Sequence, residues 1–326
     1  MSENTTQLLA DGTALITRTI PVPDTLSDAA QRHLATGHSW APDQDTPEQY
    51  EQIALARAMY PVEIEEVQMA GVPVKIVRPQ QPHTQGNGRV LLNLHGGGFV
   101  TDSGSMLESI PLAALTGITV VTVLYRLTPQ HLFPAAVDDA AAVYGELLKT
   151  HTAQNIVVYG TSAGGTLSAQ LMVRLQRDAQ PMPAALGFFT AIADLGRPGD
   201  SMSYFGVPGL ANAQPVERGG LGMAERLGVS DARTPEVSPL YANLRSFPPT
   251  LCIAGTRDML LSATANFQRA LLRAGVNADL VVFDAMPHAH WYMVGIPEAR
   301  EANELMAAYF LHRLGLPTHR DLRPWA

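Results

Sequence analysis

The sequence is poor in cysteine and in charged residues. Its 326 residues include one cysteine, so the chain can form no internal disulfide and offers no set of thiols for a metal site. That residue, Cys252, lies in the apolar run 250–254 and is interpreted as a buried strand residue. Only 16% of the residues are charged, whereas 46% are hydrophobic. This composition excludes wholesale disorder and predicts a large buried core.

Basic residues are few and do not cluster. The formal net charge is −8 at pH 7, so we expect no nucleic-acid partner and no attraction to an anionic membrane. No uncharged apolar run approaches the roughly 18 residues of a membrane helix. The first eleven residues are polar and lack the apolar stretch of a signal peptide. A cytoplasmic protein is therefore expected.

Short apolar runs alternate with helical patterns along most of the chain. The predicted strands are 62–68, 72–77, 90–94, 118–124, 156–159, 185–189, 250–254 and 280–283, of which the first two form a hairpin. The predicted helices are 24–36, 47–60, 106–115, 134–149, 163–177, 262–273 and 298–314. Strands that alternate with helices predict an α/β fold, with a mostly parallel sheet covered by helices on both faces.

One stretch interrupts this alternation. Residues 194–240 contain no clear strand and many Gly, Pro and Met residues, so we interpret them as a partly helical insertion. The core is then divided into residues 61–193 and 241–326, and residues 1–60 are expected to be a helical cap segment. Ligands bind beyond the carboxyl ends of the strands in such sheets. The insertion and the N-terminal helices are therefore expected to form a lid over that edge.

The pattern Gly160-x-Ser162-x-Gly164 follows a predicted strand and opens a predicted helix. It is typical of a nucleophile elbow, in which a serine sits on a strained strand-to-helix turn and glycines avoid a clash. The N-terminus of the helix also favours a developing oxyanion. The pattern alone is equally compatible with a glycine-rich turn, but the flanking strand and helix favour the catalytic interpretation.

A second glycine-rich segment follows the predicted strand 90–94. It reads His95-Gly96-Gly97-Gly98-Phe99. In an α/β hydrolase, bare N–H groups of such a loop form an oxyanion hole together with the N–H after the nucleophile. The candidate donors are Gly97, Gly98 and Ala163. The alternative is an anion-binding or flexible loop, although no lysine follows as in a phosphate loop. His95 is interpreted as fixing the loop, because it precedes the serine.

Serine chemistry also needs an acid and a base after Ser162. Asp258 and His288 each follow a predicted strand, which places them at the carboxyl edge of the sheet. The order Ser162, Asp258, His288 is that of α/β hydrolases. The alternatives are His290 for the base and Asp279 and Asp284 for the acid.

Taken together, these motifs resemble the bacterial hormone-sensitive-lipase-like esterases, α/β hydrolases with an HGGG loop. The resemblance spans residues 60–314. The segments that carry it are His95-Gly96-Gly97-Gly98-Phe99, Tyr125-Arg126-Leu127-Thr128-Pro129, Phe133-Pro134-Ala135-Ala136-Val137-Asp138-Asp139, Gly160-Thr161-Ser162-Ala163-Gly164-Gly165, Ser238-Pro239-Leu240-Tyr241 and Asp258-Met259-Leu260.

The resemblance implies a helical cap over a sheet of about eight strands, no cofactor and no metal. It implies hydrolysis of short- or medium-chain carboxylic esters, with Ser162 as nucleophile, Asp258 as acid and His288 as base. Relatives of this kind often form homodimers, so a second copy of the chain is the only macromolecular partner expected.

The sequence departs from the family pattern at three positions. His290 stands where an aromatic residue is common, which keeps it open as a base. Thr161 replaces an aspartate found before the serine in many members, and this resembles the GTSAG-type subgroup. Gln130 replaces a common glutamate, and its neutral amide is expected to alter hydrogen bonding around the elbow.

The function expected is that of a serine carboxylesterase that acts through an acyl-enzyme, with a small ester or lactone as substrate. Lactone hydrolysis would use the same groups and stays open. An amidase or formamidase, and a catalytically inactive ligand-binding member, are further alternatives. The apolar candidates for lining the pocket are Phe99, Met202, Tyr204, Phe205, Met223 and Trp291.

Overall fold

The centre of the protein is a twisted eight-stranded sheet. A computed structural model describes residues 5–39, 41–210 and 222–318, and the strand order is β10-β9-β8-β7-β5-β6-β4-β3. The antiparallel strands are β3 (Val62–Met69) and β4 (Val72–Pro79), which pair with each other and, through β4, with β6. The parallel strands are β5 (Val90–Leu94), β6 (Val120–Val123), β7 (Ile156–Thr161), β8 (Ala185–Phe189), β9 (Thr250–Gly255) and β10 (Ala278–Phe283). The mostly parallel α/β-hydrolase sheet is therefore confirmed.

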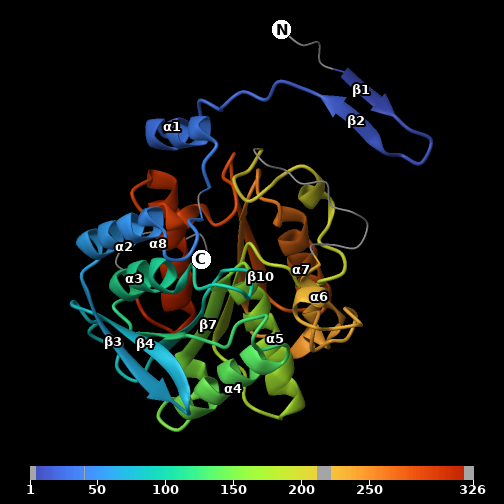
Figure 1. Cartoon of the computed structure of the whole chain (residues 1–326). Helices are drawn as coiled ribbons and strands as arrows, with labels where there is room; N and C mark the ends of the chain where they lie inside the picture. The colour runs from blue at the N-terminus through green and yellow to red at the C-terminus, as the bar shows by residue number, and fades with distance from the viewer. Residues whose placement is uncertain (1–4, 40, 211–221, 319–326) are drawn as a thin grey trace.

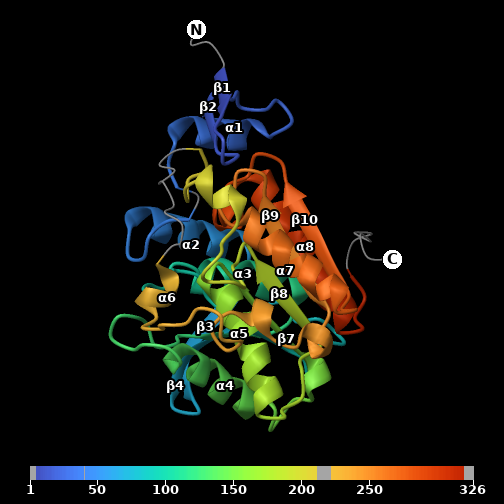
Figure 2. The same ribbon diagram turned by 90° about the vertical axis from the view of Figure 1, so that its right-hand side faces the viewer.

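Helices cover both faces of this sheet (Figure 1, Figure 2). One face packs against α3 (Ser105–Thr116) and α8 (Pro297–Arg313), whose apolar residues share one core cluster. The other face packs against α4 (Ala135–Leu147), α5 (Ala163–Arg177) and α7 (Leu261–Arg273), which share a second cluster. All residues of β5, β6, β7, β8 and β9 are buried. This explains why these strands are continuous apolar runs rather than alternating ones.

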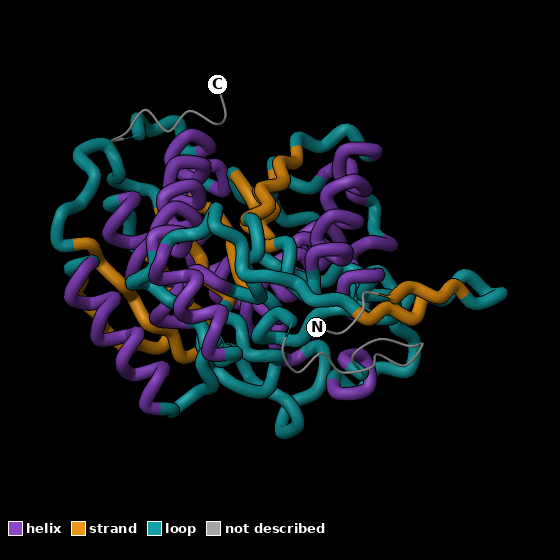
Figure 3. The backbone as a smooth tube through the Cα atoms, turned by 90° about the horizontal axis from the view of Figure 1, so that it is seen from above, coloured by secondary structure: helices purple, strands orange, loops and turns teal. Residues whose placement is uncertain are grey.

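The N-terminal segment is not wholly helical, so that part of the prediction for residues 1–60 is wrong. It contains α1 (Asp28–Thr36) and α2 (Pro47–Met59), but also an antiparallel hairpin of β1 (Thr5–Leu8) and β2 (Ala14–Thr17). The hairpin projects from the body of the protein (Figure 1, and from above in Figure 3). Its turn contains Asp11-Gly12, a common hairpin signal that the sequence analysis did not use.

The insertion is partly helical, as expected. Short helices occur at η2 (Asp200–Ser203), α6 (Met223–Arg226) and η3 (Pro239–Tyr241), while 211–221 of the predicted 194–240 lie outside the described residues. The remaining short helices are η1 (Ala153–Asn155), η4 (Leu244–Ser246) and η5 (His290–Tyr292). Within the described ranges, no helix is both long and apolar enough to cross a bilayer.

Candidate active site

Ser162 occupies the sharp turn between β7 and α5. Its backbone has φ 57° and ψ −120°, a strained conformation for a residue with a side chain. A Cβ added at Gly160 or at Gly164 would lie under 3.0 Å from the Leu94 carbonyl oxygen on β5. The Ser162 N–H donates to the Phe189 carbonyl on β8 at 2.9 Å. The two glycines thus let the elbow pack closely on the neighbouring strand, as the motif predicted.

The three side chains expected to form the triad lie in contact. The distance from His288 Nε2 to Ser162 Oγ is 3.0 Å, and the distance from His288 Nδ1 to Asp258 Oδ1 is 3.1 Å. Asp258 comes from the loop after β9 and His288 from the loop after β10, which is the adjacent parallel strand. Neighbouring strand ends therefore bring together residues that are distant in the sequence.

Asp258 is fully buried, yet it is surrounded by donors. Burial alone would raise the pKa of its carboxyl, but His288 and hydrogen bonds from Thr190 and from the Leu260 N–H outweigh burial. The Leu260 N–H lies 2.8 Å from Oδ1, and the Thr190 hydroxyl donates to Oδ2. The pKa of Asp258 consequently lies below its usual range, which keeps the carboxylate charged beside the imidazole.

Thr190 is a site residue that the sequence analysis missed. It follows β8, between the strands that carry Ser162 and Asp258, and its hydroxyl lies 2.9 Å from His288 Nδ1. Its φ of 41° is rare for a β-branched residue and indicates strain that the surrounding structure enforces. A threonine hydroxyl matches no catalytic motif. The one feature of the sequence that could have indicated Thr190 is its position at the carboxyl end of a central strand.

The glycine loop faces the same space as Ser162. Gly97 and Gly98 have φ values of 127° and 64°, and a Cβ at Gly97 would overlap the Thr101 backbone. Among the described contacts, the N–H groups of Gly97, Gly98 and Ala163 donate no hydrogen bond, and all three residues line the cavity that contains Ser162. These N–H groups are available to an oxyanion.

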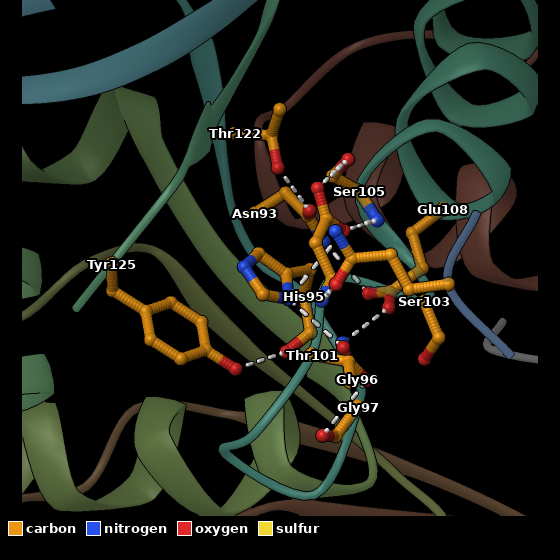
Figure 4. Close-up of polar contacts among 12 residues, drawn as sticks. Asn93, His95, Gly96, Gly97, Thr101, Ser103, Ser105, Glu108, Thr122 and Tyr125 are labelled. Atoms are coloured by element: carbon orange, nitrogen blue, oxygen red, sulfur yellow. Dashed lines mark hydrogen bonds and ion pairs between the residues drawn. The ribbon is translucent and has the colours of Figure 1, made fainter. Parts of the chain in front are cut away.

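His95 holds the start of this loop (Figure 4). Its ring stacks on Tyr125 with 4.2 Å between centroids, and Tyr125 Oη donates to the His95 carbonyl at 2.6 Å. His95 Nδ1 lies 2.9 Å from the Gly96 carbonyl oxygen. These contacts agree with the interpretation of His95 as a residue that fixes the loop.

The residues considered as alternatives to His288 and Asp258 have other surroundings. His290 is buried between the rings of Phe283 and Trp291, and burial lowers its pKa to about 3. Asp284 accepts from the Thr25 hydroxyl, and Asp279 lies 4.0 Å from Arg313 on α8. None of the three has a described contact with Ser162.

Gln130 makes no described contact with the elbow, so the effect expected of its amide stays a prediction. The side chain is exposed in the turn after β6, and no hydrogen bond joins it to the elbow among the described residues. Thr161, another departure from the family pattern, does have a structural role. Its hydroxyl accepts from Trp291 Nε1 at 3.2 Å, which ties the elbow to the segment after His288.

The cavity beside Ser162 has a volume of about 520 Å³ and mostly apolar walls. Of the predicted lining residues, Met202, Phe205 and Met223 face it. Phe99, Tyr204 and Trp291 do not. In the part of the chain that the structure describes, no three His, Cys, Asp or Glu side chains gather to hold a metal ion.

Comparison with known proteins agrees with this fold. A family model described as alpha/beta hydrolase fold matches residues 91–292. An acetyl-hydrolase of Streptomyces hygroscopicus is 33% identical over 229 residues, which cover 68% of this chain and 75% of that protein. The crystal structure of esterase E25 has a TM-score of 0.79 and 31% identity, and covers 91% of this chain and 97% of that chain. An esterase from the bacterial hormone-sensitive lipase family has a TM-score of 0.76 and 28% identity, with coverage of 89% and 99%.

The fold and the matches define a hydrolase of the α/β-hydrolase class. Within that class, the chain belongs to the bacterial hormone-sensitive-lipase-like esterases. It is therefore an enzyme of the carboxylesterase type.

Proposed function

We propose that the protein hydrolyses short- to medium-chain carboxylic esters through an acyl-enzyme formed on Ser162. The observation that carries the proposal is the unbroken chain of contacts from Ser162 Oγ through the His288 ring to Asp258. The cavity of about 520 Å³ that opens on this serine has the size of a small-molecule site. Its apolar walls suit an acyl chain.

In the first step, His288 Nε2 takes the hydroxyl proton of Ser162 as Oγ attacks the ester carbonyl carbon. A new C–O bond forms, and the carbonyl oxygen becomes an oxyanion that accepts hydrogen bonds from the N–H groups of Gly97, Gly98 and Ala163. Asp258 stabilises the imidazolium and holds the ring orientation. The imidazolium then protonates the leaving alcohol as its C–O bond breaks.

In the second step, water replaces the alcohol. His288 takes a proton from the water, whose oxygen attacks the acyl carbon. The same N–H groups donate hydrogen bonds to the second oxyanion. The bond to Ser162 Oγ breaks, the serine recovers its proton from His288, and the carboxylic acid leaves.

We propose further that 1–60 and 194–240 form the cap, and that 61–193 with 241–326 form the catalytic core. The cavity wall supports this division, because Pro42 from the first cap segment and Pro208 from the second line the same cavity as Ser162. The first segment is attached to the core, since Gln49 Nε2 on α2 donates to the Asp102 carbonyl at 3.0 Å.

The direct test is hydrolysis of p-nitrophenyl butyrate by the wild type and by Ser162→Ala. The wild type is expected to be active, and the variant to lose at least about 1,000-fold in kcat, because only binding and oxyanion stabilisation remain. Activity of the alanine variant close to that of the wild type would contradict the assignment. A panel of linear esters, lactones and amides at matched concentration then defines the substrate class.

A further inference from the structure

Beneath the glycine loop lies a buried carboxyl group that the proposed mechanism does not use. Glu108 belongs to the first turn of α3 and is 3% exposed. Among the described residues, no Lys, Arg or His nitrogen lies within 4.0 Å of its carboxylate. A buried carboxyl without a cation is unfavourable unless several donors satisfy it.

Those donors come from three separate elements, and Figure 4 shows two of the donor residues, Asn93 and Gly96, beside Glu108. Gly96 N–H, at the start of the glycine loop, lies 2.9 Å from Oε1, and Asn93 Nδ2 on β5 lies 2.8 Å from Oε2. Tyr292 Oη on η5 donates to Oε1 at 2.5 Å. Since η5 directly follows the segment that carries His288, one carboxyl group connects the loop of the oxyanion donors to the segment of the base.

Gly104 provides independent support for this connection. Its φ of −117° is open to any residue, so the backbone does not require glycine there. A Cβ at this position, however, would lie under 3.0 Å from both Glu108 Oε1 and Tyr292 Oη. Position 96 also has no room for a side chain, because a Cβ added at Gly96 would lie 2.7 Å from Tyr292 Oη. Both glycines leave the space in which the carboxyl and the phenol meet.

We infer that Glu108 is a positioning residue for the oxyanion hole. It fixes the position of the glycine loop relative to the η5 segment. The Gly96 N–H that it holds is one residue before Gly97, the first candidate oxyanion donor. A displacement of about 1 Å in such a donor lowers the rate by about 100-fold. Glu108 does not line the cavity beside Ser162, so it acts through the backbone of Gly96 and the hydroxyl of Tyr292.

The inference rests on the proposed esterase function, and the kinetics separate the two. The variants are Glu108→Ala, Glu108→Gln and Gly104→Ala, and kcat is expressed per active site titrated with an organophosphate. Glu108→Ala removes the acceptor, whereas Glu108→Gln keeps an oxygen for Gly96 and Tyr292. Gly104→Ala keeps both groups but pushes the carboxyl aside, and it decides the question if Glu108→Ala does not fold.

The matched control is Thr116→Val at the other end of the same helix. The buried Thr116 hydroxyl donates to the Leu112 carbonyl and accepts from the Ile118 N–H. Its loss should lower the melting temperature without changing kcat, as expected for a purely structural residue.

We expect Glu108→Ala and Gly104→Ala to lower kcat at least about tenfold with KM changed less than about threefold, which is the signature of lost transition-state stabilisation. Glu108→Gln should keep kcat within about threefold of the wild type. A kcat within about twofold of the wild type in Glu108→Ala or Gly104→Ala, or an effect confined to KM, would overturn the inference. If the wild type itself hydrolyses no ester, or Ser162→Ala stays active, the proposed function fails instead.

Discussion

At the scale of single residues, the site depends on side chains that no motif contains. Ser162, Asp258 and His288 are recognisable from order and spacing, whereas Thr190 is a buried hydroxyl at the end of β8. Its oxygen lies against both the acid and the base of the proposed triad. A strained backbone is maintained at this residue, which is typical of positions that serve function rather than stability.

Thr190→Val tests this hydroxyl, since valine has nearly the same shape. The Thr190 hydrogen bond is among the interactions that lower the pKa of Asp258, so its loss should raise that pKa. We expect kcat to fall about tenfold, as for a lost hydrogen bond to a charged group. Thr190→Ser, which restores a hydroxyl, is the control. An unchanged kcat for Thr190→Val would exclude this role.

At the scale of elements, the short helix η5 joins the separate parts of the site. Its Trp291 donates to Thr161 at the elbow, and its Tyr292 donates to Glu108 on α3. The His288 segment, the elbow and the glycine loop are therefore connected by buried polar contacts. This arrangement also places a carboxyl in the core, where ionisation is unfavourable.

The stability of the protein should depend on pH through that carboxyl. Burial raises the pKa of Glu108 from 4.5 to about 8, against the effect of its three donors. Between these values the native state holds a proton that the unfolded state has lost, so the free energy of unfolding falls as pH rises. The titratable groups that face Glu108 are Asp102, Tyr125, Tyr159 and Tyr292.

Glu108→Gln has no proton to lose at this position. Its free energy of unfolding relative to the wild type should therefore increase between pH 5 and pH 8, by at most about 1.4 kcal/mol per pH unit. Urea unfolding of both proteins at pH 5, 6.5 and 8 measures this difference. If the free energies of unfolding of the two proteins differ by the same amount at all three pH values, the pKa of Glu108 is not raised by folding.

At the scale of the whole molecule, local sequence patterns predicted the helices and strands whose formation depends on neighbouring residues in the sequence. The bounds of β5, β8 and α5 agree with the predicted ones, because buried apolar runs and a glycine-flanked helix start are local signals. The roles of Thr190 and Glu108 were not predictable in this way, since each depends on a partner far away in the sequence: Asp258 is 68 residues from Thr190, and Tyr292 is 184 residues from Glu108. Only the assembled sheet brings such groups together. The exposed hairpin β1–β2 was missed because its strands bury nothing.

The choice of base follows from the same assembly. His288 and His290 are two residues apart, yet only His288 reaches Ser162, while His290 packs against Phe283 and Trp291. His290→Phe should preserve that packing and the activity, because a ring replaces a ring. His288→Ala removes the proposed base and should remove the reactivity of the serine.

Covalent trapping of Ser162 tests the central claim most directly. Diethyl p-nitrophenyl phosphate transfers its diethylphosphoryl group to an activated serine and releases p-nitrophenolate, and intact-protein mass spectrometry with peptide mapping locates the adduct. We expect one adduct, on Ser162, in the wild type and in His290→Phe, and none in Ser162→Ala or, on the same timescale, in His288→Ala. An adduct on another residue, or rapid labelling of His288→Ala, would contradict the account.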